Sequence, residues 1–471
     1  MKKLLWQCAV LAVLCSCAVG PDYKRPDVTN ITPTDWRWKI AEPKDTIPKG
    51  EWWKLFKDPA LDELEDGAVS NNQNLRAAVA RIDEYLAAAR LSRGRLFPEL
   101  SLDPSFSRQR TSAHQPIPIP LPSQFKEVSM QLNSFSVPLD LSYEVDLWGR
   151  VRRSLESAKA QAQASVADYH NVLLALTADV AADYFRVRSL DAEIAVLRRT
   201  VELRDETVRI LSDRFTTGTV PESDLAQAKT ELASAKAGLA DTARQRAETQ
   251  NAIALLCGRP ASSFEIHKCP LTAEPPVIPA GLPSSLLERR PDIARAERNL
   301  AAKNAQIGVA RAAYFPVLHL TGQAGYLSDS VDNLFLYGNR IWSFGPGVSL
   351  PLFTGGRTAA DVDQAKASYD EGLADYRQTV LTAFKEVEDS LAQIVFTNEQ
   401  AAAQDEALAS AERVNILAKA RYEAGAISRF ELLDAERNKL QYELQKARIE
   451  GQRFGASVRL IKALGGGWEK L

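Results

Sequence analysis

Two cysteines and a histidine are the strongest candidates for chemistry in this chain of 471 residues. Cys257 and Cys269 flank His267 in a stretch whose glycine, proline and serine residues predict a loop. Two thiols can form a disulfide, or they can bind a metal ion together with the imidazole. The metal site lacks a fourth ligand and the close Cys-x-x-Cys spacing that zinc sites usually have. The sequence therefore favours a disulfide and predicts no metal.

Motifs for catalysis are not found in the sequence. The four histidines are scattered, no glycine-rich phosphate loop follows a predicted strand, and no Gly-x-Ser-x-Gly nucleophile motif occurs. The run Gly465-Gly466-Gly467 ends the last predicted helix, where glycine acts as a stop signal. These observations argue against an enzyme and give no reason to expect a cofactor.

The N-terminus predicts the compartment. Two lysines precede an apolar run, Leu4 to Leu14, that is too short to span a bilayer, and Leu14-Cys15-Ser16-Cys17 follows. This order is similar to that of a bacterial lipoprotein signal, which implies that residues 1–16 are removed and that Cys17 carries covalent lipid such as palmitate. In bacterial lipoproteins, Asp directly after the cysteine favours retention in the inner membrane, so the resemblance implies that Ala18 favours the outer membrane. An ordinary secretory signal cut nearby is the alternative.

Export also bears on charge and redox state. Removing both lysines of the signal takes the formal net charge from −2 to −4, which does not favour binding to nucleic acid. Three of the five cysteines lie in the signal or directly after it. The remaining pair, Cys257 and Cys269, is expected in the oxidising periplasm, where a disulfide is the favoured state.

The elements that carry the remaining charged motifs occur twice. Arg214-Phe215-Thr216-Thr217-Gly218, with Asp224-Leu225 after it, recurs as Arg421-Tyr422-Glu423-Ala424-Gly425, with Glu431-Leu432 after it, at a constant offset of 207 residues. Each half predicts a helix, a pair of strands, a very long helix, a tight glycine turn and a returning helix. A duplicated unit of this kind suits a duct better than an active site.

Long helices dominate the prediction. Residues 149–213 contain no proline and only the initial glycine, and their apolar residues recur at steps of three and four, which is typical of a coiled-coil seam. About 65 residues at ~1.5 Å each make a rod of roughly 100 Å. The return helix is expected at 222–256, and the second half repeats the pair at 357–420 and 428–464. Rods of this length are typical of a protein that crosses a gap.

Strand pairs are predicted at 99–147 and 317–352. Apolar and polar residues alternate strictly over 135–147, so that one face can meet lipid and the other, with its acidic groups, can meet water. A half-buried sheet in a soluble domain gives the same alternation. Four strands cannot close a barrel, and an open sheet edge in a bilayer leaves backbone groups unsatisfied at several kcal/mol each. Membrane strands would therefore require a homo-oligomer.

These elements divide the chain into four parts. Residues 1–16 are the signal, residues 17–58 an extended arm, residues 59–283 the first structural repeat and residues 284–471 the second. Trp52-Trp53 is interpreted as an aromatic anchor of the arm.

Four segments resemble the lipoprotein branch of the TolC-like outer-membrane efflux factors. They are Cys17-Ala-Val-Gly-Pro-Asp-Tyr23, Leu141-Ser-Tyr-Glu-Val-Asp-Leu-Trp-Gly-Arg150, Leu287-Glu-Arg-Arg-Pro-Asp-Ile293 and Ala312-Ala-Tyr-Phe-Pro316. The resemblance covers nearly the whole mature chain. It implies a mainly α fold with a β-barrel, in which long antiparallel coiled-coil helices form a periplasmic tunnel and four transmembrane strands per chain complete a twelve-stranded barrel in a homotrimer.

The resemblance also implies a function. Members of the family are the outer-membrane channels of tripartite efflux systems, passive gated ducts that carry small molecules delivered by an inner-membrane pump and a periplasmic adaptor (membrane fusion) protein. The pump is typically of the resistance-nodulation-division class, and it selects the substrate. Such a channel lies in the outer membrane, anchored by lipid, and extends into the periplasm.

A gate can be carried over from the family. Its acidic side chains follow the turn of the inner helix pair, and the aligned residues here are Glu431 and Asp434, beside Phe430, where some relatives place an apolar constriction. A ring of like charges from three chains attracts cations and raises carboxylate pKa values. The alternative is that both acids belong to a solvated first helical turn, where they suit the helix N-terminus.

Closed channels of the family hold the inner helix pair by polar links. The aligned residues are Asp224 and Tyr422, a reasonable carboxylate and hydroxyl pair. Ile427 stands where some relatives carry an arginine, so one charged link is missing here.

The adaptor is expected to meet the tips of the two helix pairs. These tips are marked by Arg214 and Gly218 in the first repeat and by Arg421 and Gly425 in the second. Each arginine can instead cap the carbonyl groups at the end of its own helix.

Two other functions stay open from the sequence. A duct for type I protein secretion has the same architecture, but the lipoprotein start and the arm motif favour efflux. A lipid-anchored periplasmic coiled coil would explain Cys17 and the rods, but not the amphipathic strand pairs. The transported substrate is not indicated.

Overall fold

The computed structural model describes residues 18–38, 50–112, 131–269, 271, 274–278, 283 and 286–466. The chain forms two compact units, each built from segments far apart in the sequence. The sheet unit contains the described residues of Met1–Arg25, Asp83–Gln163 and Arg298–Ala374, and the hairpin unit contains those of Pro26–Ile82, Ala164–Glu297 and Asp375–Leu471. Both units draw on both sequence repeats, so the repeats are interleaved rather than separate domains.

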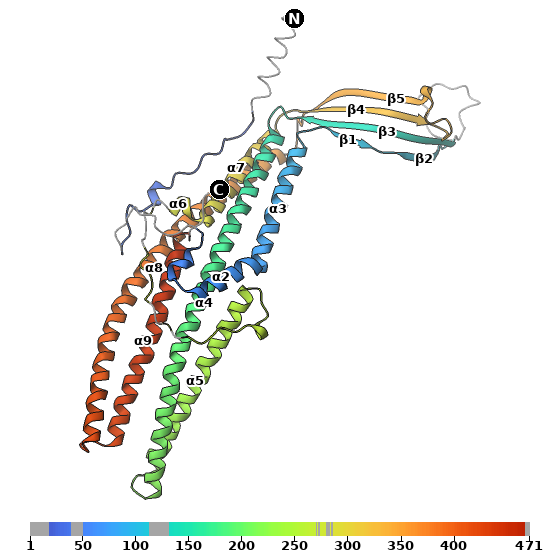
Figure 1. The fold of residues 1–471 in the computed structure, drawn as a ribbon. Coiled ribbons are helices and arrows are strands. Elements are labelled where there is room, and N and C mark those ends of the chain that lie inside the picture. Colours follow the sequence, from blue (N-terminus) through green and yellow to red (C-terminus); the bar gives the residue numbers. More distant parts are fainter. Residues whose placement is uncertain are drawn as a thin grey trace. The chain divides into compact units, whose positions relative to one another are not determined.

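Helices make up most of the described chain (Figure 1). The α-helices are α2 (Pro59–Asn71), α3 (Gln73–Gly94), α4 (Arg150–Thr216), α5 (Glu222–Leu256), α6 (Leu286–Arg289), α7 (Pro291–Ala312), α8 (Arg357–Glu423) and α9 (Arg429–Ala463). Short 3-10 helices are η1 (Thr29–Ile31), η2 (Trp52–Phe56), η4 (Ala261–Ser263) and η6 (Tyr337–Asn339). Both α4 and α8 have 67 residues, which corresponds to about 100 Å. Among the described helices, none is long and apolar enough to cross a membrane.

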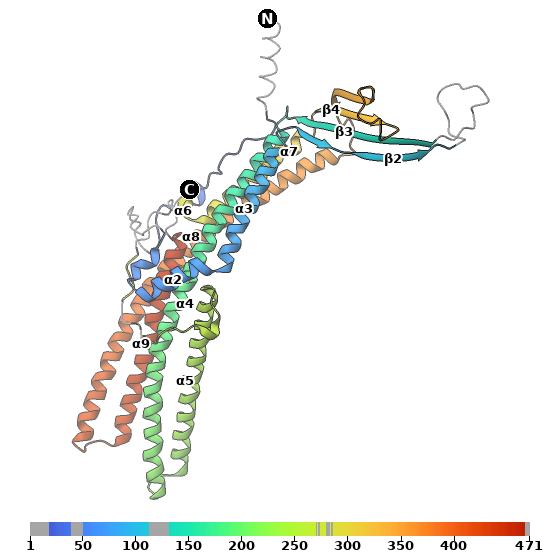
Figure 2. The same cartoon turned by 45° about the vertical axis from the view of Figure 1, so that its right-hand side comes forward.

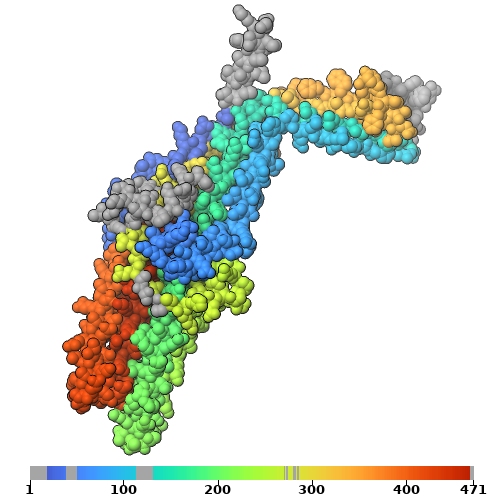
Figure 3. All heavy atoms as spheres, viewed as in Figure 1, coloured from blue at the N-terminus to red at the C-terminus, as the bar shows by residue number. Residues whose placement is uncertain are grey.

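The sheet is antiparallel throughout. β3 (Gln131–Val145) pairs on one side with β4 (Val317–Ser328), which pairs with β5 (Arg340–Ser349). On its other side β3 pairs with both β1 (Glu99–Leu102) and β2 (Ser105–Arg110), which thus form one strand interrupted at Asp103-Pro104. Figure 3 shows β4 and β5, in orange, lying along β1 to β3. Within the described residues, the outer edges of β1/β2 and of β5 have no partner strand.

The pairing register sorts the side chains onto two faces. The apolar face carries Leu100, Leu102, Phe106, Phe135, Val137, Leu139, Leu141, Tyr143, Val145, Leu318, Leu320, Ala324, Tyr326, Trp342, Phe344 and Val348. The opposite face is rich in Ser, Thr, Gln, Asp and Glu, and there Gln323 Nε2 donates to Asp140 Oδ1 at 2.9 Å. In the single chain Trp342 is 81% exposed and Val348 is 70% exposed. An exposed apolar face of this size is typical of a surface that contacts lipid or another protein.

The length of this face matches a membrane. Phe135 to Val145 cover about 34 Å along β3 at ~3.4 Å per residue. A strand tilt of roughly 40° reduces that to about 26 Å, close to the apolar band of ~25 Å on outer-membrane barrels.

The junction between β3 and α4 fixes the base of the sheet. The Asp146 carboxylate accepts hydrogen bonds from the backbone N–H groups of Val151 at 3.0 Å and Arg152 at 2.8 Å, and so caps the N-terminus of α4. Trp148 stacks on Phe315 with ring centroids 4.7 Å apart, and its Nε1 donates to the Pro316 carbonyl at 2.8 Å. Two of the segments that carry the family resemblance are therefore packing motifs at this junction.

The hairpin unit contains two helical hairpins, α4–α5 and α8–α9, which lie side by side with both turns at the same end (Figure 2). Their other ends are closed in the same way. Asn72 Nδ2 donates to the Leu256 carbonyl at the end of α5, and Arg290 Nη1 donates to the Ala463 carbonyl at the end of α9, both at 2.9 Å. The two acceptors are 207 residues apart, so the duplication extends to single hydrogen bonds.

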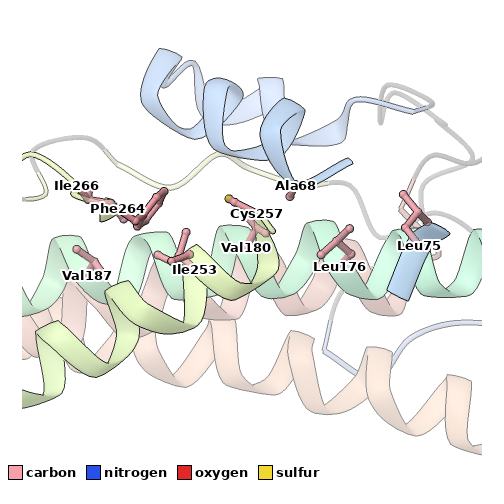
Figure 4. Packing of buried hydrophobic residues seen from close by; sticks show 10 residues of the cluster. Ala68, Leu75, Leu176, Val180, Val187, Ile253, Cys257, Phe264 and Ile266 are labelled. Atoms are coloured by element: carbon pink, nitrogen blue, oxygen red, sulfur yellow. The ribbon is translucent and has the colours of Figure 1, made fainter. Parts of the chain in front are cut away.

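A hydrophobic cluster joins α2, α3, α4 and α5 (Figure 4). Its buried members include Ala68, Leu176, Val180, Ile253 and Cys257. Close to the cluster, Trp52 is 1% exposed, donates from Nε1 to Thr177 Oγ1 at 3.2 Å and lies edge-on to Trp53. Trp52 and Trp53 thus pack the arm on the hairpin unit.

One buried carboxyl group in α2, that of Glu65, has no hydrogen bond within the described chain to offset the cost of its burial. Glu65 is fully buried, and among the described residues neither of its carboxylate oxygens has a hydrogen-bond partner. Burial, reinforced by the negative charges of Asp66 and Asp62, raises the pKa of Glu65 well above its usual value. Because the folded state holds the neutral acid while the unfolded state ionises near pH 4.5, stability falls as the pH rises from there through the raised pKa.

We expect Glu65→Leu to raise the melting temperature by several degrees at pH 7.5 and by much less at pH 4.5, because the variant removes an acid that is costly to bury only when the unfolded chain is ionised. Scanning calorimetry or fluorimetry at both pH values measures this. The exposed neighbour Glu63 provides the control, and Glu63→Leu should leave the pH dependence unchanged. Equal gains at both pH values for Glu65→Leu would contradict the assignment.

Candidate gate at the hairpin tips

The two hairpin turns have one construction. In the first, Thr219 N–H donates to the Arg214 carbonyl at 2.9 Å and Gly218 N–H donates to the Phe215 carbonyl at 3.0 Å. In the second, Ala426 and Gly425 donate to the carbonyls of Arg421 and Tyr422 at 2.8 and 2.9 Å. Gly218 and Gly425 have φ of 71° and 70°, which favours glycine. Both turns are Schellman motifs, so the backbones of Arg214 and Arg421 close their helices while their side chains lie at the tips.

Glu431 is built into the start of α9. Ser428 Oγ accepts from Glu431 N–H at 3.3 Å, and Glu431 Oε1 accepts from Ser428 N–H at 3.3 Å. This reciprocal pair is a capping box, which satisfies two backbone donors that the helix N-terminus leaves open. Glu431 thus belongs to the first turn of the helix and stabilises its N-terminus, and its side chain is nevertheless exposed.

Asp434 and Phe430 face different surroundings. Asp434 is exposed and forms an ion pair with Arg437 one turn later on α9. Phe430 is half-buried and packs against the cluster of Leu211, Leu225 and Ala228 from the α4–α5 hairpin. The sequence predicts all three residues at a pore constriction. Within one chain Glu431 and Asp434 are exposed, whereas Phe430 is half-buried.

Asp224 and Tyr422 are not hydrogen-bonded to each other within the described chain. Asp224, in the first turn of α5, accepts from Ser223 Oγ at 3.2 Å. The Tyr422 ring is 38% exposed, and the Arg429 guanidinium lies 5.6 Å from its centroid. A link between these two residues would therefore need another conformation or a neighbouring chain.

Grooves flank the N-terminal turns of α9 on two sides. One, of about 440 Å³, lies between α9 and the α4–α5 hairpin, and its lining includes Arg204, Asp224, Glu231 and Arg437. The other, of about 670 Å³, lies between α8 and α9. Arg204 pairs with Glu231 across α4 and α5. This pair was not predicted, because it joins two helices at positions that no sequence motif marks. The role of Ser428 was not predicted either, although Ser-x-x-Glu is a capping signal that can be found in a sequence.

The candidate disulfide does not form in the structure. Figure 4 shows Cys257 over Val180, where its thiol lies 3.5 Å from the Leu64 carbonyl. Cys269 lies beside a part of α4 that is further along the helix, where the Cys269 N–H donates to Asp191 Oδ2 at 3.3 Å. Val180 and Asp191 are about 16 Å apart along the helix, and a disulfide requires Cα atoms within ~7 Å. The prediction of a Cys257–Cys269 disulfide is therefore wrong for this structure. The chain between the two cysteines runs along α4 and does not fold back to bring the thiols together.

His267 and the thiols also form no metal site in the described residues. The His267 carbonyl accepts from Arg188 Nη1 at 2.7 Å, so this segment is held through its backbone.

Cys17, the candidate lipidation site, lies outside the described residues. The residues after it are held at the base of the sheet unit. Val19 N–H donates to the Trp148 carbonyl at 2.9 Å, and Arg153 Nη2 donates to Asp22 Oδ1 at 2.7 Å. The start of the arm is thus fixed beside the junction of β3 and α4.

Comparison with known proteins identifies the architecture. The family model described as "Outer membrane efflux protein" matches residues 64–259 and 282–466. The chain belongs to this family. The solvent efflux pump outer membrane protein SrpC of Pseudomonas putida is 34% identical over 470 residues, covering 97% of each chain. The toluene efflux pump outer membrane protein TtgC, also of Pseudomonas putida, is 35% identical and covers 99% of this chain and 96% of TtgC.

Solved structures agree with this membership. The Campylobacter jejuni CmeC outer membrane channel matches with a TM-score of 0.86 at 28% identity and covers 96% of each chain. The outer-membrane channel OprN matches with the same TM-score at 29% identity, covering 96% of this chain and 100% of that one. The resemblance to outer-membrane efflux factors is confirmed, and so is the fold of long helices with a small sheet. The chain is an outer-membrane efflux channel rather than an enzyme, which accounts for the lack of catalytic motifs.

We expect the two cysteines to differ in reactivity. Burial raises the pKa of the Cys257 thiol to about 11, so it holds little thiolate at pH 8, whereas Cys269 is exposed. Maleimide labelling of the folded protein should modify Cys269 alone, and labelling after denaturation without reductant should modify both. Recovery of an oxidised pair that labels only after reduction would contradict the structure.

Proposed function

We propose that this efflux channel works as a homotrimer in a tripartite system. The observation that carries the proposal is a sheet with an apolar face of membrane height and two edges without partner strands in the described chain. Three copies, joined edge β1/β2 to edge β5, give a closed barrel of twelve strands with no edge in lipid. Closure turns the apolar face outward to lipid and the polar face, with Asp140 and Glu144, toward water.

The helices then form the periplasmic part of the duct. We infer that the two hairpins of each chain line a tunnel whose periplasmic end is ringed by six turns, two from each of three chains. A periplasmic adaptor would dock at these turns, near Arg214, Gly218, Arg421 and Gly425, and an inner-membrane pump of the resistance-nodulation-division class would deliver substrate. The names of SrpC and TtgC as parts of efflux pumps support this assignment.

The gate is proposed at the start of α9. Glu431 and Asp434 are exposed, and three copies would form two acidic rings. The capping box holds the Glu431 side chain at the helix end, where it remains exposed. Phe430 belongs to the same segment and moves with it.

The closed state is proposed to use a link between Tyr422 and Asp224 of neighbouring chains, since the two do not meet within one chain. Because this link would resist opening of the channel, Tyr422→Phe should raise the single-channel conductance. An unchanged conductance would show that the link does not hold the closed state.

Cys17 is proposed to carry the lipid anchor. The clamp of Val19 and Asp22 to the base of the sheet unit supports this, because it keeps the first mature residues beside the proposed membrane strands. Mass spectrometry of the mature N-terminus would show a diacylated or triacylated cysteine, and an unmodified N-terminus would refute the anchor.

The cargo is proposed to be small organic molecules. SrpC is named for solvents and TtgC for toluene, and both are similar to this chain to nearly the same degree. Toluene is itself an organic solvent, so the two names agree on small apolar organic molecules.

The principal test is the mass of the detergent-solubilised protein by light scattering, together with conductance in planar bilayers. We expect a trimer that passes small, cation-selective currents, because the sheet edges must pair and the mouth is acidic. A monomer that stays in solution without detergent and shows no conductance would overturn the proposed function.

The acidic gate can be tested without disturbing the helix. Glu431→Gln keeps the capping box, since Gln serves at the same position, but it removes the charge. Combined with Asp434→Asn, it should reduce the cation over anion permeability ratio by several-fold in bilayer recordings. Glu222→Gln at the tip of the first hairpin is the matched control and should leave the ratio unchanged. An unaltered ratio in the double variant would place the selectivity elsewhere.

A further inference from the structure

We propose that Phe430 is a latch that holds the start of α9 on the tip of the α4–α5 hairpin. The side chain is seated on Leu211, Leu225 and Ala228, with Val208 and Val220 completing the seat. The Arg214 guanidinium lies over the Phe430 ring, 5.4 Å from its centroid, in a cation–π contact. Phe430 is therefore half-buried against its own chain in this conformation.

The repeat shows that this contact is specific. The counterpart of Phe430 at the offset of 207 is Ser223, an exposed residue at the start of α5. Other parts of the tips are preserved, since Arg214 corresponds to Arg421 and Leu225 to Leu432. An aromatic side chain at this position occurs only in the second hairpin, so the latch is a departure from the duplicated plan.

The contacts further along α9 show how the rest of the helix is held on α4. α4 and α9 touch closely at Ser189 and Gly451, where a Cβ on the glycine would lie 2.3 Å from Ser189 Oγ. Polar pairs follow toward the tips, among them Glu193 with Arg448 at 2.8 Å. Beyond them lies the groove of about 440 Å³ between α9 and the α4–α5 hairpin. Beside this groove, the apolar seat of Phe430 attaches the first turn of α9 to the α4–α5 hairpin.

The contacts at Gly451 and at Phe430 hold α9 at two points that lie far apart on the helix. About 21 residues separate Gly451 from Phe430, which corresponds to roughly 31 Å of helix. The close contact at Gly451 is suited to act as a pivot, and the latch lies at the far end. Release of Phe430 would let the segment that carries Glu431 and Asp434 move, so this movement, which rests on the proposed function, would couple the first hairpin to the gate.

Hydrogen exchange followed by mass spectrometry tests the latch on the purified full-length protein. Phe430→Ala should speed exchange about tenfold in the first turns of α9 and also in residues 208–228, because both sides of the contact lose packing. Phe430→Leu, which keeps an apolar side chain, should have a much smaller effect. Arg214→Gln should speed exchange in α9 to an intermediate degree. Ser223→Ala, at the corresponding position of the other hairpin, is the matched control and should change neither segment.

The outcomes of this experiment distinguish failure of the proposed latch from failure of the proposed channel function. If Phe430→Ala leaves residues 208–228 unchanged, or if Ser223→Ala has an equal effect, the latch is wrong even where the wild-type protein conducts as proposed. If exchange couples the two segments but the wild-type protein forms no conducting trimer, the latch stands and the proposed function fails. If both hold, Phe430→Ala should also increase the time that single channels spend open.

Discussion

A backbone edge without hydrogen bonds cannot face lipid, and the proposed assembly follows from this constraint. The sheet of one chain presents an apolar face about 26 Å high, and it ends in β1/β2 on one side and β5 on the other. In water such a sheet would be both exposed and open to aggregation. In a membrane it is stable only when closed by further copies. Oligomerisation is thus a condition for the strands to occupy lipid at all.

The duplication explains how one plan supplies both hairpins. Turn hydrogen bonds, the glycine conformations at the tips and the hydrogen-bonded carbonyls at the C-terminal ends of the return helices recur at an offset of 207 residues. These shared features concern chain reversal and helix ends, which any hairpin needs. The differences concern the tips: Phe430 replaces a serine, and Ser428 with Glu431 forms a capping box where the first hairpin has Pro221. Specialisation is therefore concentrated in the start of α9.

Much of the fold could be predicted because its signals are local. The lack of proline and the steps of three and four residues indicate α4, and alternation indicates the faces of β3. Contacts between distant segments were not predictable in the same way. The disulfide was wrong because spacing in the sequence says nothing about the path of a loop along α4. The seat of Phe430 joins three helices, so no single segment reveals it.

The start of α9 shows how one residue can serve both structure and function. Glu431 completes a capping box, and the same side chain is exposed at the turn where the proposed gate lies. A carboxylate near a helix N-terminus is stabilised by the unpaired N–H groups and by the helix dipole. These local interactions offset part of the repulsion that a ring of three carboxylates would create. The cap thus makes a ring of like charges compatible with a folded tip, while the latch at Phe430 sets where that tip rests.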